Sequence, residues 1–116
     1  MCFAARKKAG TTNAGLWEFP GGKIQVGESQ EEALIREWQE EFGWEIEPLQ
    51  ALAQVKSLTG TGAPLWLIPW RIGSKQIQPK HLTDHDAVAW IKPADVRHLA
   101  WGPADEQVLS EVLGWL

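Results

Sequence analysis

The most informative stretch of this chain runs from Gly22 to Trp44 and reads GKIQVGESQEEALIREWQEEFGW. Between Glu28 and Glu47 the sequence has eight glutamates and a single basic residue, Arg36. Like charges three or four residues apart destabilise an isolated helix by about 0.2–0.5 kcal/mol per pair. A helix that keeps so many carboxylates close together therefore indicates a functional use for them.

Local signals predict where this helix begins and ends. Ser29 followed by Glu32 is a capping-box pattern, which predicts a helix that begins near Gln30. Gly43 suits the end of the helix, because glycine adopts a left-handed conformation without steric cost. An apolar stripe with helical spacing predicts the face that packs on the core, and it comprises Leu34, Ile35, Trp38 and Phe42.

Three carboxylates, Glu37, Glu40 and Glu41, share the face of the predicted helix next to that stripe. Hard divalent cations take oxygen ligands, and Mg²⁺ is typically held by one or two carboxylates together with substrate phosphates. The alternative is a solvated acidic face, the usual interpretation of a charge run. The preceding Gly21-Gly22 pair, which lets the backbone approach a ligand closely, favours metal-dependent phosphate chemistry.

In this order and spacing the residues resemble the Nudix hydrolase signature, G-x5-E-x7-R-E-U-x-E-E-x-G-U, where U is a bulky aliphatic residue. Every fixed position is filled, by Gly22, Glu28, Arg36, Glu37, Glu40, Glu41 and Gly43. The two U positions carry Trp38 and Trp44 instead of an aliphatic residue. Both are large and apolar, so we expect altered core packing and unchanged chemistry.

The resemblance extends over about Phe3 to Leu113, beyond the signature itself. Leu16–Lys23 and Thr83–Trp90 are similar to segments of MutT-type nucleoside triphosphate pyrophosphatases, and Trp101–Asp105 resembles the P-A-N or P-A-D stretch that reads the base there. The resemblance implies an α+β fold, a Nudix α/β/α sandwich with a mixed central sheet. We expect a single domain over residues 1–116.

The activity that the resemblance implies is Mg²⁺-dependent hydrolysis of a nucleoside triphosphate, of the 8-oxo-dGTP or CTP type, to a monophosphate and pyrophosphate. Mn²⁺ is an alternative cation. Oxygen ligands for the metal are implied at Gly21 (its carbonyl), Glu37, Glu40 and Glu41. Arg36 is expected to pair with Glu28 and so to orient the helix and the loop. The base that deprotonates the attacking water could be Glu41, Glu37 or Asp84.

Four residues are expected to bind the substrate: Lys7, Phe19, Lys23 and Asp105. A carboxylate at Asp105 could accept a hydrogen bond from a purine edge, or donate one when protonated. The competing interpretation is an acid in the first turn of a helix, where the dipole favours it. For Lys7 and its neighbour Arg6 the alternative is a solvated basic pair. The three histidines lack metal-ligand spacing and are expected to be surface or core residues, with His85 the only one near the proposed site.

The remaining elements follow from hydrophobic pattern and turn residues. Strands are predicted at 1–6, 16–19, 49–57, 65–72 and 87–91, a turn at 59–64, a loop at 73–86, a helical turn at 92–96, and a helix from 103 or 104 to 113. Pro69 within one strand predicts an edge or a bulge. Relatives in the family begin with a further strand before the segment that matches 1–6. Its absence would leave an unpaired sheet edge, so we expect either a truncated sequence or a homodimer that covers the edge.

Composition limits the classes of function. The chain has 116 residues, 44% of them hydrophobic, and a formal net charge of -4, which disfavours binding to a nucleic acid polymer. No apolar run approaches the roughly 20 residues of a membrane span, and no signal peptide is evident. Cys2 is the only cysteine, which fits a reducing cytoplasm. The partner is expected to be a small nucleotide. The alternatives to a triphosphate pyrophosphohydrolase are a hydrolase of ADP-ribose or dinucleoside polyphosphates and a catalytically silent nucleotide-binding module.

Overall fold

The computed structural model describes residues 2–58 and 64–114 of the chain. The elements in chain order are β1 (Cys2–Lys7), β2 (Trp17–Glu18), α1 (Gln30–Phe42), β3 (Glu47–Ala51), β4 (Val55–Leu58), β5 (Pro64–Leu67), β6 (Trp70–Gly73), β7 (His85–Ile91), the 3-10 helix η1 (Pro93–His98) and α2 (Pro103–Leu113). The turn predicted at 59–64 lies almost entirely outside the described residues. The α+β class predicted from the sequence is confirmed.

The strands of the described residues form three antiparallel sheets. β1 lies between β2 and β7, with Ala5 opposite Glu18 on one side and Val88 on the other. β3 pairs with β6, and β4 pairs with β5. The only parallel pairing within the described residues is an isolated bridge between Trp17 and Trp101. The parallel part of the expected mixed sheet is thus confined to that bridge.

Two predicted strands are each broken in the structure. The strand expected at 49–57 is divided into β3 and β4, and the strand expected at 65–72 is divided into β5 and β6. The break in the second strand lies at Ile68-Pro69, where proline has no N–H to donate to a ladder. The carbonyl of Pro69 still accepts from the N–H of Leu52 at 2.8 Å. Two continuous strands were therefore a wrong prediction, whereas the irregularity at Pro69 is confirmed.

Helix α1 begins and ends where the sequence predicts. Ser29 and Glu32 form the complete capping box, and Gly43 closes the helix in the left-handed region at φ +59°. An added Cβ at Gly43 would lie 3.0 Å from the ring of His81, so the position has little room as well as a positive φ. Of the predicted apolar stripe, Trp38 and Phe42 are buried but Ile35 is 43% exposed, and Ala33 is buried in its place.

Two clusters of buried side chains form the core. One joins α1 to the sheet and comprises Phe3, Ala5, Trp38, Phe42, Trp44 and Ile46. The other joins the sheet to η1 and α2 and comprises Ala4, Ile91, Val96, Trp101 and Leu109. The first cluster contains both tryptophans of the U positions, in edge-to-face contact with each other at 5.3 Å between ring centroids.

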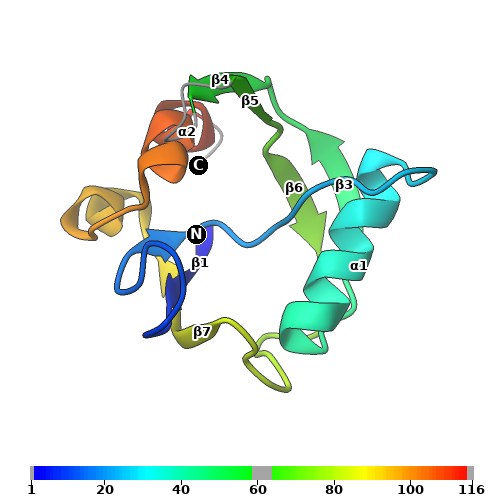
Figure 1. Ribbon diagram of the computed structural model, residues 1–116, viewed down its shortest axis with the longest axis horizontal. Coiled ribbons are helices and arrows are strands. Elements are labelled where there is room, and N and C mark those ends of the chain that lie inside the picture. The colour runs from blue at the N-terminus through cyan, green and yellow to red at the C-terminus, as the bar shows by residue number, and fades with distance from the viewer. Residues whose placement is uncertain (1, 59–63, 115–116) are drawn as a thin grey trace.

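Figure 1 shows α1 on one side of the molecule and β1, β7 and α2 on the other. The chain from β2 to α1 crosses between these two sides, and it contains the Gly21-Gly22 pair. This crossing brings the glycine loop to the carboxylate face of α1.

Among the described residues, neither helix has the length and apolar character that a bilayer-spanning helix requires.

Candidate active site

Arg36, in the middle of α1, holds the glycine loop against the helix. Its Nε and Nη2 atoms donate to the two carboxylate oxygens of Glu28, both at 2.8 Å. Nη2 also donates to the carbonyl of Lys23 at 3.0 Å. The hydrogen bond from Arg36, reinforced by the N–H of Gln25, lowers the pKa of Glu28 to about 2. The ion pair predicted between Arg36 and Glu28 is therefore confirmed, in a bidentate form.

The same guanidinium contacts two of the expected metal ligands. Nη1 of Arg36 donates to Glu37 Oε1 at 2.8 Å and to Glu40 Oε2 at 3.2 Å. The hydrogen bonds that Arg36 donates to Glu28 and Glu37 raise the pKa of Arg36, which stays charged. The side chain of Glu37 is 17% exposed and that of Glu40 is 59% exposed. One cation thus offsets part of the like-charge repulsion along this face of the helix.

Glu37 also lies directly against the glycine loop. An added Cβ at Gly22 would overlap the Glu37 carboxylate, so only glycine leaves that carboxylate its present place. Gly21 is exposed, and an added Cβ there would meet no atom within 4 Å. The side chain of Lys23 is exposed, and Lys23 contacts Arg36 through its backbone carbonyl.

Glu41 and Asp84 meet although they are 43 residues apart in sequence. The backbone N–H of Asp84 donates to Glu41 Oε2 at 3.4 Å. Burial first, and then the neighbouring Asp84 carboxyl, raise the pKa of Glu41. Two contacts hold the Asp84 loop on the end of α1: the Thr83 hydroxyl donates to the Glu40 carbonyl at 3.2 Å, and the Lys80 N–H donates to the Phe42 carbonyl at 2.8 Å.

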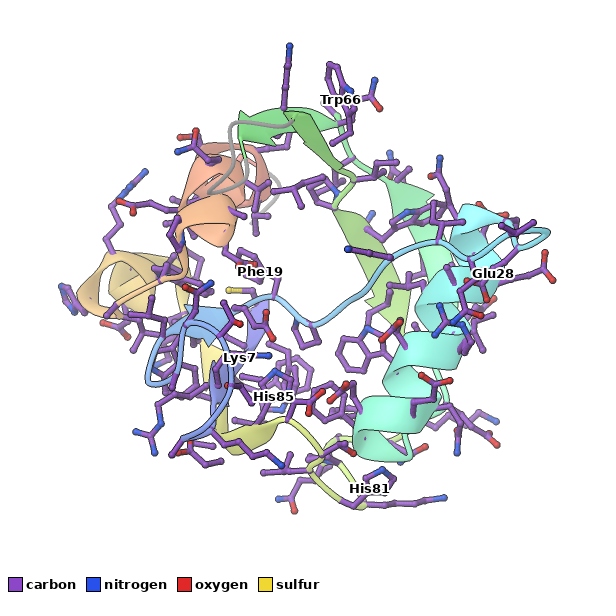
Figure 2. The ribbon with its side chains drawn as sticks, in the orientation of Figure 1. Lys7, Phe19, Glu28, Trp66, His81 and His85 are labelled. Atoms are coloured by element: carbon purple, nitrogen blue, oxygen red, sulfur yellow. The ribbon has the colours of Figure 1, made fainter. Side chains whose placement is uncertain are left out.

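His85 and Glu18 belong to the same site, although the sequence predicted a role there for neither and placed His85 near the site only as a surface or core residue. His85 is only 6% exposed, and its Nε2 pairs with Glu18 Oε1 at 2.7 Å. Its Nδ1 lies 3.7 Å from Glu41 Oε2. Figure 2 shows His85 on the part of the molecule that faces α1. The available signal was position alone, because each residue is the sequence neighbour of an expected site residue, Asp84 or Phe19.

The donor set fits a hard divalent cation. Three carboxylates on one helix face offer oxygen atoms, and the glycine loop brings backbone to Glu37. Within residues 2–58 and 64–114, no group of three or more His, Cys, Asp or Glu residues converges closely enough to hold a metal ion. Mg²⁺ usually keeps several waters and is completed by substrate phosphates, so an incomplete protein shell is compatible with its binding.

A second part of the site joins Phe19 to Asp105 across 86 residues. The N–H of Phe19 donates to Asp105 Oδ1 at 2.9 Å, and the Phe19 ring packs on Trp101 with 4.6 Å between centroids. Burial raises the pKa of Asp105 to about 6. Asp105 also lies in the first turn of α2, so both sequence interpretations of this residue are compatible with its position.

Lys7 lies beside this second part of the site. It lines a hollow of about 150 Å³ together with Glu18, Asp105 and residues of the loop after β1. Its neighbour Arg6 is engaged elsewhere, in an exposed ion pair with Asp86 at 2.7 Å. Lys7 therefore borders the hollow, whereas Arg6 does not.

We expect the Asp105→Asn variant to lose a pH dependence of stability that wild type shows between about pH 4 and pH 6. The pKa of Asp105 is about 6 in the folded state and 3.8 as the ordinary value, so over this range the folded state binds more protons. The contribution of Asp105 is thus fully present below about pH 4 and is lost as the pH rises through about 6. The loss is at most about 3 kcal/mol.

Urea unfolding at several pH values tests this expectation. Asparagine keeps an oxygen that accepts from the Phe19 N–H but does not ionise. The free energy of unfolding of the variant should therefore rise relative to that of wild type as the pH rises. Parallel stability curves from pH 4 to pH 7 would contradict a buried, uncharged carboxyl at this position.

Comparison with known proteins identifies the family. The NUDIX domain family model matches residues 2–112. The chain belongs to the Nudix family. The resemblance of the signature residues, from Gly22 to Gly43, is thereby confirmed.

Two relatives are similar over most of this Nudix chain. A protein named putative 8-oxo-dGTP diphosphatase 2 of Mycobacterium tuberculosis is 33% identical over 85% of this chain and 70% of its own length. The CTP pyrophosphohydrolase of Escherichia coli K12 is 34% identical over 91% of this chain and 77% of its own length. With the family, these relatives make the chain a hydrolase of the nucleotide pyrophosphohydrolase group.

Solved structures agree with the Nudix assignment. The E. coli ORF135 protein superposes with a TM-score of 0.81 at 30% identity, over 97% of this chain and 79% of that one. A MutT protein from Methanosarcina mazei Go1 also gives 0.81, at 26% identity, over 97% and 82%. The Nudix fold expected from the sequence is confirmed.

Proposed function

We propose that this Nudix hydrolase cleaves a nucleoside triphosphate to a nucleoside monophosphate and pyrophosphate, with Mg²⁺ or Mn²⁺ as the cation. The observation that carries the proposal is the set of contacts that the signature residues make in the structure. Arg36 gathers Glu28, Glu37 and Glu40, while Glu41 lies beside Asp84. The relatives named for CTP and for 8-oxo-dGTP support a triphosphate as the substrate class.

The residues that would hold the metal are Glu37, Glu40, Glu41 and the carbonyl of Gly21. When bound, the metal would neutralise phosphate charge and polarise the bond that is cut. The proton of the attacking water would pass to one carboxylate, that of Glu41, Glu37 or Asp84. Arg36 would hold the helix and the glycine loop in their relative positions through its bidentate contact with Glu28.

The opposite end of the nucleotide would be bound by Phe19 and Asp105. The hydrogen bond from the Phe19 N–H to Asp105, together with the ring packing on Trp101, supports this assignment. Lys7 and Lys23 would supply positive charge to the phosphates, since Lys7 borders the hollow beside Asp105 and Lys23 lies in the glycine loop.

A panel of nucleotides tests the reaction and the substrate class together. Canonical and 8-oxo-substituted triphosphates, ADP-ribose and a dinucleoside polyphosphate are each incubated with the chain and Mg²⁺, and pyrophosphate and phosphate are measured separately. We expect pyrophosphate from at least one triphosphate and little product from ADP-ribose. Turnover of ADP-ribose alone would favour the other Nudix activity, and no turnover with retained nucleotide binding would favour a silent binding module.

The same panel applied to Asp105→Ala tests base recognition. Loss of one buried hydrogen-bonding group typically costs about 1–3 kcal/mol, so we expect KM for the preferred nucleotide to rise about tenfold. KM for the other nucleotides should change far less. An equal change for every nucleotide would contradict the assignment of Asp105 to the base.

The proposal includes two further expectations. A homodimer is expected, because β2 and β7 are the edge strands of the three-stranded sheet within the described residues. Light scattering measures the assembly. A cytoplasmic location is expected from the single cysteine, Cys2.

A further inference from the structure

The buried imidazole of His85 lies between two carboxylates that come from different elements. Its Nε2 pairs with Glu18 Oε1 of β2 at 2.7 Å, and its Nδ1 lies 3.7 Å from Glu41 Oε2 of α1. The side chain of His85 is 3% exposed, whereas those of Glu18 and Glu41 are 29% and 17% exposed. A buried histidine held in this way by its surroundings has a fixed ring orientation.

Two contacts fix that orientation, and a strand pairing fixes the backbone of the residue. The Glu18 carboxylate holds Nε2. The ring stacks on Phe42 with 5.5 Å between centroids and 22° between planes. The backbone of His85 opposes Lys7 in the pairing of β1 with β7. The imidazole therefore cannot turn away from α1 without breaking a hydrogen bond and a ring contact.

The Nδ1 atom is the unexplained feature of this arrangement. It is inaccessible to solvent and has no hydrogen-bond partner among the described residues. A buried polar atom that lacks a partner costs about 1–3 kcal/mol. Glu41 Oε2, at 3.7 Å, lies just outside hydrogen-bond range. Hydrogen bonds at catalytic sites are often long in ligand-free structures and shorten when the substrate complex forms.

We propose that His85 is a positioning residue, held by Glu18 through Nε2, that fixes the Glu41 carboxylate through Nδ1. The inference rests on the proposed function, in which Glu41 is a metal ligand. Groups that hydrogen-bond to a metal ligand orient it, and their removal typically lowers metal affinity or activity about 10–100-fold. His85 acts through Glu41 and does not itself contact the nucleotide.

This contact also connects the two parts of the site. Glu18 directly precedes Phe19, whose N–H is held by Asp105. A series of neighbouring groups therefore runs from Asp105 through β2 and His85 to Glu41, and its last gap, from Nδ1 to Oε2, is 3.7 Å. Movement of the helix away from the nucleotide-binding end would widen that gap.

Three substitutions of His85 test the inference by Mn²⁺ binding, followed by electron paramagnetic resonance, and by steady-state kinetics. His85→Phe keeps a ring to stack on Phe42 but removes both nitrogens. His85→Asn places an amide near the former Nδ1, toward Glu41. His85→Gln places an amide near the former Nε2, toward Glu18. His98→Asn, at an exposed histidine in η1, is the matched control.

We expect His85→Phe to raise the Kd for Mn²⁺ about tenfold and to lower kcat about 10–100-fold. His85→Asn should recover part of the Mn²⁺ affinity, and His85→Gln should recover less. A merely structural role would lower the melting temperature of all three variants and leave the Mn²⁺ affinity of the folded protein unchanged. If His85→Phe does not fold, the comparison of His85→Asn with His85→Gln decides, and equal affinities would overturn the inference.

Two reference proteins separate this inference from the proposed function. If wild type binds no Mn²⁺, the proposed function itself fails. If wild type binds Mn²⁺ and Glu37→Gln weakens that binding, while every His85 variant binds like wild type, only the role of His85 is overturned.

Discussion

Replacing Glu41 with glutamine is expected to lower kcat about a thousandfold, equivalent to about 4 kcal/mol of transition-state stabilisation. Glutamine keeps the size of the side chain but removes the charge that a metal ligand or a general base requires. Burial and the Asp84 carboxyl already raise the pKa of Glu41, so the folded protein loses no favourable charge interaction with Asp84. Stability should therefore be equal to or above that of wild type. Steady-state kinetics with the preferred triphosphate, together with thermal unfolding, measures both quantities.

The matched control is Glu31→Gln. Glu31 is an exposed glutamate in the first turn of the same helix, so the substitution removes the same charge from α1 at a distance from the site. We expect kcat of this variant to be close to that of wild type. A kcat for Glu41→Gln within about threefold of the control would show that the Glu41 carboxylate is dispensable, against the proposed mechanism.

Replacing Gly22 with alanine is the second large expected effect. It acts on activity by displacing the carboxylate of Glu37. The new Cβ would occupy the space of the Glu37 carboxylate. That carboxylate is the far end of a flexible side chain, so it can move aside at small cost in stability. A displacement of about 1 Å in an active site can cost about 100-fold in rate, and we expect a loss of that order in kcat.

Gly21→Ala is the comparison for Gly22→Ala. An added Cβ at Gly21 meets no atom within 4 Å, and the substitution keeps the backbone carbonyl that is proposed to bind the metal. The loss of kcat should therefore be much smaller than at Gly22. Equal losses for the two variants would indicate that loop flexibility, and not the position of Glu37, limits the rate. Circular dichroism and thermal unfolding check that both variants fold.

The elements that depend on neighbours in sequence were predicted well. Helix α1 begins at Gln30 and ends before Gly43 because the capping box and the left-handed glycine satisfy helix ends within a few residues. The ion pair of Arg36 with Glu28 spans eight residues and was also expected. Such contacts form within one helix and the loop beside it, so the local pattern contains the information that they need.

The pairing of distant segments was predicted less well. Residues 49–57 were expected to form one strand but are divided into β3 and β4, because each part pairs with a different strand across Pro69. Ile35 was assigned to the core by helical spacing, yet it is 43% exposed. Helical spacing defines a stripe, but only the packing of α1 on the sheet selects which edge of the stripe is covered.

For this protein the sequence by itself determined the helix with the carboxylates, the glycine loop and the family. Only the tertiary structure showed that Glu18 and His85 lie beside Glu41, and that Nδ1 of His85 is buried without a partner. The reason is physical. A capping box or a ligand spacing is a local property of the chain, whereas a contact across 67 residues, such as that of Glu18 with His85, exists only after strands and helix have packed.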